Sequence, residues 1–327
     1  MPNGEPMTVA LVTGVTGQDG SYLLERLVDE GVEVHGLVHT GDPLLPEVRA
    51  AHPGLHLHDG DLADRASLRS LVRDVSPDEL YNLAGVSSVA QSWQEPELTG
   101  ELNGLVVTTL LEAALGAQEA TGRPVAVVQA SSAEIFGDPE HTPQNERTPI
   151  RPTNPYGAAK AYAHHMASIY RSRGLPVSSC ILFNHESPRR PPSFVTRKIT
   201  QGAARIARDG TGVIRLGNLD ARRDWGWAPD YVDALVRAVR HPHADDYVVA
   251  SGTTHSVAEF AAAALRRAGV ADWGRWVATD PGLLRPADAT QLVGDPSKAR
   301  AVLGWEATMS FDGLVAAMVD HDMDLLR

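Results

Sequence analysis

The chain has little of what secreted and membrane proteins require. Its 327 residues contain one cysteine, Cys180, so no intramolecular disulfide can form, and the apolar run around it indicates a core residue rather than a catalytic thiol. No apolar run approaches the roughly 18 residues of a membrane span. The first residues, MPNGEP, lack the basic-then-apolar pattern of a signal peptide. We therefore expect a cytoplasmic protein without a membrane partner.

Positive charge is also scarce. The formal net charge is −12 and no basic tract stands out, so a nucleic-acid partner is not expected. Local anion binding stays open, because helix N-termini and a few arginines can provide it. Hydrophobic residues make up 43% of the chain, which allows a substantial core in one large domain or two moderate ones.

Short apolar runs alternate with amphipathic helical patterns in the first half of the chain. Strands separated by helices indicate parallel βαβ units, so the predicted fold class is α/β, a Rossmann-type doubly wound parallel sheet. The predicted strands are 8–13, 32–38, 55–59, 79–84, 124–130 and 176–183, and the predicted helices are 21–30, 65–75, 101–120 and one beginning at Asn154-Pro155.

After about residue 184 the alternation becomes irregular, which predicts a smaller C-terminal substrate-binding domain. The Rossmann domain is expected to comprise 1–183, with 226–254 returning to it, and the substrate lobe to comprise 184–225 and 255–327. Further predicted elements are a surface loop at 136–153, a helix at 193–208, a strand at 246–250, a helix opening with the capping box Ser256-x-x-Glu259, and a final helix.

A glycine-rich turn, Gly14-x-x-Gly17-x-x-Gly20, lies between the first predicted strand and helix. Glycine is needed there because the turn is tight, the backbone approaches a pyrophosphate and the helix packs closely on the strand. The helix N-terminus then attracts the anion. A purely structural turn is the competing interpretation, but the position in the first βαβ unit favours dinucleotide binding.

The end of the second strand usually selects between NAD and NADP. Here the stretch from Val38 to Asp42 contains His39 but no arginine, and its acidic residue comes a few positions late. The choice therefore stays open. Asp61, after the third strand, is a candidate adenine contact, although a solvated turn residue is equally compatible with its position.

Tyr156 and Lys160 are four residues apart in a predicted helix and share a face. A free tyrosine has a pKa of about 10, but a neighbouring ammonium and an oxidised nicotinamide both favour the phenolate. Such a tyrosine can take the proton of a sugar hydroxyl while hydride leaves the same carbon. The alternative is a Tyr–Lys pair that occurs by chance on the surface of a helix. The dinucleotide-binding turn earlier in the chain argues against this alternative.

The fifth predicted strand ends in Ser132-Ala133-Glu134, where doubly wound folds place their ligands. Ser132 could hydrogen-bond the reacting oxygen beside Tyr156. Hydride transfer does not need a carboxylate, whereas elimination of water needs a group that removes a carbon-bound proton and protonates a leaving hydroxyl. Glu134 could do both; a capping or salt-bridging role is the alternative.

These motifs together resemble the GDP-mannose 4,6-dehydratases of the extended short-chain dehydrogenase superfamily. The most specific stretches are LFNHESPRR at 182–190 and FVTRKIT at 194–200, beside SSAEIFG at 131–137 and NPYGAAK at 154–160. The resemblance implies that hydride passes from sugar C4 to the cofactor and returns to C6. Glu134 would remove the C5 proton and assist loss of water, and GDP-4-keto-6-deoxymannose would result.

The resemblance also implies a set of contact residues. The expected cofactor contacts are Gly14, Thr16, Gly17, Gln18, Asp19, Gly20, His39, Asp61, Leu62, Leu83, Ala84, Tyr156 and Lys160. The expected nucleotide-sugar contacts are Ser87, Asn184, Val195, Lys198, Arg223, Arg285 and Asp288. No metal is expected in this site. For the arginines, solvated surface charge is the competing interpretation.

Three positions depart from the family pattern. Ser132 stands where threonine is usual, which keeps the hydroxyl. The stretch from His39 to Asp42 replaces an Arg-Arg-Ser-Ser sequence that grips NADP and helps tetramers pack, which leaves NAD or NADP and dimer or tetramer open. Asp288 replaces a glutamate near the nucleotide, so the base and the sugar are less firmly indicated. A homodimer formed by helices near 101–120 and 156–173 is expected.

Two other functions remain possible from the sequence. A nucleotide-sugar epimerase or reductase of the same superfamily would use Tyr156 and Lys160 without needing Glu134 as acid and base. A nucleotide-binding scaffold with a dead active site would not need Ser132, Tyr156 and Lys160, and the presence of all three argues against it.

Overall fold

The computed structural model describes residues 7–284, 289 and 291–327. The chain folds into two compact units: the first contains Met1–Ile135, Asn154–Ile181 and Val232–Tyr247, and the second contains Phe136–Thr153, Leu182–Tyr231 and Val248–Arg327. The returning segment is thus 232–247, and the loop 136–153 groups with the second unit. None of the helices in the described ranges has the length and apolar character needed to cross a bilayer.

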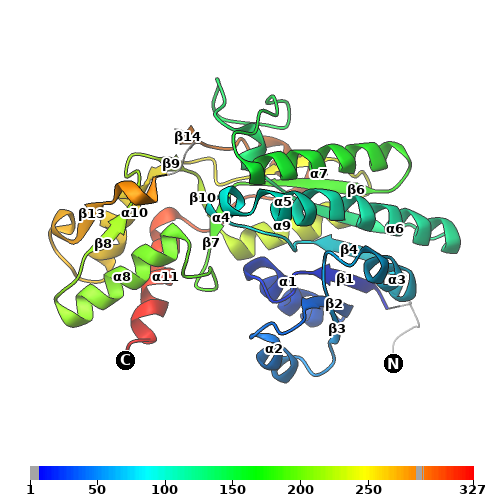
Figure 1. The fold of residues 1–327 in the computed structure, drawn as a ribbon, viewed down its shortest axis with the longest axis horizontal. Helices are drawn as coiled ribbons and strands as arrows, with labels where there is room; N and C mark the ends of the chain where they lie inside the picture. Colours follow the sequence, from blue (N-terminus) through cyan, green and yellow to red (C-terminus); the bar gives the residue numbers. More distant parts are fainter. Residues whose placement is uncertain (1–6, 285–288, 290) are drawn as a thin grey trace. The chain divides into compact units, whose positions relative to one another are not determined.

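A seven-stranded sheet forms the centre of the first unit, in the order β11-β6-β5-β4-β1-β2-β3 (Figure 1). Its strands are β1 (Val9–Thr13), β2 (Glu33–His39), β3 (His56–Gly60), β4 (Glu79–Asn82), β5 (Ala126–Ser132), β6 (Val177–Leu182) and β11 (Asp246–Val249). The β1 pairings with β2 and β4, and those of β2 with β3 and β4 with β5, are parallel. The predicted doubly wound α/β fold is confirmed, and the strand order reverses between β1 and β4.

Helices cover both faces of this sheet. They are α1 (Gln18–Asp29), α2 (Leu45–Ala51), α3 (Arg65–Val75), α4 (Val89–Gln94), α5 (Pro96–Gly100), α6 (Val106–Thr121), α7 (Pro155–Ser172) and α9 (Ala228–Arg240). One core joins apolar side chains of α3, α6 and α7 to alternate residues of the strands, such as Leu37 and Leu80. On the other face, Arg26 of α1 and Asp233 of α9 form an ion pair at 2.5 Å.

The predicted helix 101–120 differs from the structure in its first turns. Helix α5 is followed by a π-helical turn, Glu101–Leu105, before α6 begins. In that turn the side chain of Asn103 accepts from the Val86 amide at 2.8 Å and donates to the Val86 carbonyl at 2.7 Å. The buried amide therefore ties the wider turn to the loop after β4, a long-range contact that helix periodicity does not reveal.

The described residues of the second unit form short strands and three α-helices. They are β7 (Asn184–Glu186), β8 (Ile214–Leu216), β9 (Arg222–Arg223), β10 (Trp225–Trp227), β12 (His255–Ser256), β13 (Val277–Thr279), β14 (Gln291–Leu292), α8 (Val195–Asp209), α10 (Val257–Arg267) and α11 (Phe311–Asp324). Its core packs α8, α10 and α11 around residues such as Phe260 and Met318. The predicted capping box at Ser256 and Glu259 is confirmed.

Candidate active site

The glycine-rich turn joins β1 directly to α1. Gly14 has φ +73°, a conformation that favours glycine, and a Cβ there would lie 3.0 Å from the backbone of Ala84. A Cβ at Gly20 would lie 2.1 Å from the carbonyl oxygen of Gly14, so no side chain fits where α1 packs against the turn. The turn is therefore closed as tightly as the sequence predicts, with the N-terminus of α1 following it.

A buried chain of polar groups connects the carboxyl ends of β1, β4 and β5. The Thr13 hydroxyl donates to Asn82 at 2.7 Å and accepts from the amides of Leu83 and Ala84 at 3.1 and 3.2 Å. Asn82 in turn donates to Gln129 at 2.7 Å. Since these side chains are buried and hydrogen-bonded, they fix the backbone on both sides of the point where the strand order reverses.

Glu134 is anchored by the residue that caps α7. Its Oε2 accepts a hydrogen bond from Asn154 Nδ2 at 2.7 Å. The other end of the Asn154 amide caps the helix, because Oδ1 accepts from the Gly157 amide at 2.8 Å. The hydroxyl of Ser132, at the end of β5, accepts from the Glu134 amide at 3.3 Å. The capping asparagine therefore links the carboxylate to the helix that carries Tyr156.

Lys160 is buried on the inner face of α7, with 7% of its surface exposed. Its Nζ donates to the carbonyl oxygen of Ala130 at 2.9 Å and lies 5.8 Å from the centroid of the Tyr156 ring. Burial lowers the pKa of Lys160 to about 8, although the nearby charge of Asp19 opposes the shift. Ammonium, phenol ring and strand end are thus gathered at one point of the first unit.

Comparison with known proteins identifies the family of this chain. The sequence model of the GDP-mannose 4,6 dehydratase family matches residues 11–318. GDP-mannose 4,6 dehydratase 2 of Arabidopsis thaliana is 42% identical over 334 residues, covering 99% of this chain and 89% of that protein. The chain belongs to the GDP-mannose 4,6-dehydratase family.

Solved structures with a similar fold include both dehydratases and epimerases. The dTDP-glucose 4,6-dehydratase DesIV of Streptomyces venezuelae, solved with NAD, has a TM-score of 0.84 and 25% identity and covers 97% of each chain. The UDP-glucose 4-epimerase of Thermus thermophilus, also solved with NAD, has a TM-score of 0.83 and 29% identity, with 96% of this chain and 99% of that chain covered. The fold of this family member is therefore shared by enzymes of both kinds.

The residues after β2 and β3 are the outer members of the expected cofactor set. His39 ends β2 and is exposed, and the Thr16 hydroxyl donates to Asp42 at 2.5 Å, which ties the glycine turn to the β2 loop. Asp61 is exposed, and its carboxylate accepts from the Ala63 amide at 2.8 Å. Leu62 packs against the core of the first unit.

The expected nucleotide-sugar residues are distributed over both units. Ser87 is exposed in the loop between β4 and α4 of the first unit, whereas Asn184 begins β7 in the second and is opposite Trp225. Val195 begins α8, and Lys198 follows on the same helix, half-buried. Arg223 is buried on β9 and donates to the Ala289 carbonyl at 2.9 Å. Arg285 and Asp288 lie outside the described residues.

Two positioning residues were missed from the sequence. Asn154 was identified only as a cap, and its bond to Glu134 was not anticipated. Glu186, 2% exposed, accepts from Thr196 at 2.6 Å and pairs with Arg190 at 3.2 Å, which fixes the start of α8 beside β7. The available signal was a single acidic residue in the stretch LFNHESPRR, whose other charged residues are arginines.

Proposed function

We propose that this chain is a nucleotide-sugar 4,6-dehydratase, a hydro-lyase that converts GDP-mannose into GDP-4-keto-6-deoxymannose. The observation that carries the proposal is the hydrogen bond from Asn154 to the Glu134 carboxylate. Asn154 is two residues before Tyr156, so this bond holds the carboxylate at the start of the helix that carries the phenol. Hydride transfer alone requires a phenol and an ammonium, whereas loss of water also requires a carboxyl group close to them. Membership of the dehydratase family supports the same chemistry.

The glycine turn fits a nicotinamide dinucleotide. A Cβ at Gly20 would clash with the Gly14 carbonyl, so helix α1 packs tightly against the turn, as in turns that bind a pyrophosphate. The residues from Gly14 to Gly20 would hold the pyrophosphate, and Asp61 and Leu62 the adenine. Tyr156 and Lys160 would hold the nicotinamide ribose. When bound, a nicotinamide ring would supply a reversible acceptor for the hydride of sugar C4, which C6 later receives.

The protein's own groups handle the protons. Tyr156 takes the proton of the C4 hydroxyl, with Ser132 hydrogen-bonded to the same oxygen. Lys160, fixed on the Ala130 carbonyl, electrostatically stabilises the phenolate form of Tyr156 that accepts this proton. The ketone at C4 makes the C5 proton acidic, and Glu134 removes it. Glu134 then delivers that proton to the C6 hydroxyl, which leaves as water, so the carboxylate is regenerated. Once hydride is on C6, C5 takes up a proton that has exchanged with solvent, and Tyr156 releases to solvent the proton it took from the C4 hydroxyl, so that both groups return to their starting states.

NAD fits the β2 loop better than NADP. Asp42 is tied to the glycine turn through Thr16, so the loop after β2 holds a carboxylate beside that turn, and a carboxylate there would repel a 2′-phosphate. No arginine occurs between His39 and Asp42. Mass spectrometry of the dinucleotide released from denatured protein tests this: mainly NAD supports it, and mainly NADP contradicts it.

The chain is proposed to form a homodimer through α6 and α7, by family resemblance. Three exposed apolar side chains support an interface here: Leu105 at 44%, at the end of the π-helical turn before α6, and Tyr162 and Ile169 of α7 at 40 and 52%. Ile169→Glu should convert the dimer to a monomer in light scattering. Val213→Glu, at an equally exposed valine of the second unit, is the control and should leave the mass unchanged.

The activity test follows mass without any added reductant. The protein is incubated with GDP-mannose, and separately with UDP-glucose and dTDP-glucose, in D2O. Loss of one water with deuterium at C5 supports dehydration. An inverted centre without loss of water would instead assign an epimerase, and no turnover of any nucleotide sugar would favour a binding protein.

Glu134→Gln tests the acid–base role directly. We expect loss of dehydration by at least a hundredfold with nucleotide binding retained, because removing a general acid–base group costs about 10²–10⁴ in rate. Glu140→Gln removes an exposed carboxylate six residues further along the chain, which pairs with Arg151, and should leave the rate unchanged. Dehydration at the normal rate in Glu134→Gln would remove Glu134 from this role.

A further inference from the structure

A cluster of histidines lies on β2 and β3, at the end of the strands opposite to the glycine turn and Ser132. Parallel pairing puts His35 opposite His56 and Leu37 opposite His58. Because side chains alternate between the faces of a strand, Glu33 and His35 point to the same side as His56 and His58. β3 is the edge strand of the sheet, so the cluster joins the edge to its neighbour.

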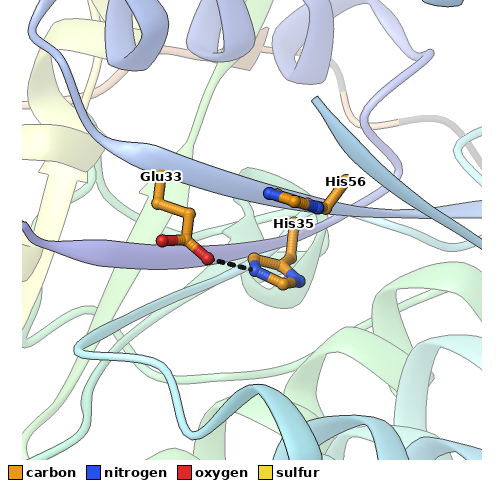
Figure 2. Close-up of side chains that lie close together, drawn as sticks. All are labelled: Glu33, His35 and His56. Carbon is orange, nitrogen blue, oxygen red and sulfur yellow. Dashed lines mark hydrogen bonds and ion pairs between the residues drawn. The ribbon is translucent and has the colours of Figure 1, made fainter. Parts of the chain in front are cut away.

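The side chains of Glu33, His35 and His56 converge closely (Figure 2). His35 Nε2 lies 3.0 Å from Glu33 Oε1, and the His35 and His56 rings stack with centroids 4.7 Å apart. One nitrogen or oxygen from each of the three residues lies within 4.8 Å of the others. The arrangement gathers two imidazoles and one carboxylate at a partly exposed position that is separate from the residues proposed for catalysis.

We propose that Glu33, His35 and His56 bind a divalent transition-metal ion, with Zn²⁺ as the best fit. Imidazole nitrogen is the ligand that zinc and its neighbours in the first row prefer, and one carboxylate completes a common set of three. Mg²⁺ and Ca²⁺ prefer oxygen ligands, and only one residue of this cluster, Glu33, has a side-chain oxygen. Water would occupy a fourth position, since His56 is exposed.

The Glu33–His35 pair needs little movement for this coordination, whereas the His56 ring must rotate out of its stack on His35. In a tetrahedral zinc site with bonds of about 2.0–2.2 Å, ligand atoms lie roughly 3.3 Å apart. The Glu33–His35 contact is already close to that spacing. His56, on the edge strand and exposed, has room to adjust its ring, so the remaining distance can close by side-chain rotation.

His58 forms a hydrogen bond with the ring nitrogen of His35 that faces away from Glu33. Its Nε2 lies 2.9 Å from His35 Nδ1. When His35 uses Nε2 as a ligand, Nδ1 carries the proton and donates it to His58, and such an outer hydrogen bond orients a ligating imidazole. His58 is therefore a positioning residue, and its loss should weaken zinc binding about tenfold or more without removing a ligand.

Zinc binding is tested by calorimetric titration of the full-length, chelator-dialysed protein. We expect one Zn²⁺ per chain in the wild type and at least tenfold weaker binding in His35→Ala and in His56→Ala. His243→Ala is the matched control: it removes an exposed histidine whose ring lies 6.0 Å from another, His241, and should bind as the wild type does. Circular dichroism shows whether each variant is folded.

Substitution of Co²⁺ adds a readout that is independent of affinity. Tetrahedral Co²⁺ with imidazole ligands should give visible absorption that disappears in His35→Ala. Absence of zinc binding to the wild type, or equal binding to His35→Ala and the wild type, would overturn the proposal. Glu134→Gln should bind zinc normally whatever its dehydratase activity, so failure of the metal site and failure of the proposed reaction are distinguishable.

Discussion

Replacing Lys160 by methionine should stabilise the protein at neutral pH while abolishing its activity. The side chain is 7% exposed, and burial lowers its pKa from 10.5 to about 8. A folded-state pKa below the unfolded value means that the unfolded chain binds the proton more tightly, so the charged lysine opposes folding below pH 8. A shift of this size corresponds to about 3 kcal/mol at pH 7.

The pH dependence of that difference is the sharper prediction. Between pH 8 and 10.5 the folded lysine is neutral while the unfolded one is still charged, so the stability of the wild type rises relative to that of Lys160→Met. From pH 7 to pH 9.5 the difference in free energy of unfolding between Lys160→Met and the wild type should shrink by about 2 kcal/mol. The bond to the Ala130 carbonyl offsets part of the absolute gain but does not affect this sign.

Urea unfolding of nucleotide-free protein at both pH values measures the gap. Lys298→Met is the control for the general effect of replacing a half-buried lysine by methionine. If the difference between the wild type and Lys160→Met is the same at pH 7 and pH 9.5, the ammonium is not desolvated as argued, and its proposed stabilisation of the phenolate loses its physical basis.

Three further changes probe other parts of the structure. Gly20→Ala should abolish dinucleotide retention and cost about 2 kcal/mol in thermal unfolding, because its Cβ would meet the Gly14 carbonyl at 2.1 Å. Asp322→Ala should cost about 3–5 kcal/mol in urea unfolding, since it leaves the buried guanidinium of Arg197 without its partner at 2.7 Å. Asn154→Asp should keep the helix cap but lose the donor to Glu134, so its kcat should fall tenfold or more with less than about 1 kcal/mol lost in unfolding.

The first unit was largely predictable because its elements are specified locally. The helix at 65–75 was predicted at its observed bounds, since Asp64 caps it and its apolar residues recur at helical spacing. Asn154 and Pro155 marked the start of α7 for the same reason. The glycine turn is likewise a local requirement, because the conformation at Gly14 and the contact at Gly20 exclude other residues.

The rest depended on contacts between distant segments. Strands such as β9, which is two residues long, have no periodicity to detect and exist because β12 and β14 flank them. The bond from Asn154 to Glu134 joins residues whose proximity depends on how α7 packs beside β5. The histidine cluster was not noticed, because it depends on the register that puts His35 opposite His56.

Buried polar groups that destabilise the fold lie where the proposed chemistry occurs. Lys160 is a buried ammonium with a depressed pKa, and the buried hydroxyl of Ser131 has no hydrogen-bond partner among the described residues. Both meet at the carboxyl end of β5, where Lys160 Nζ donates to the Ala130 carbonyl. Local violations of packing rules that gather at one strand end are expected of a site whose polar partners arrive with its ligands.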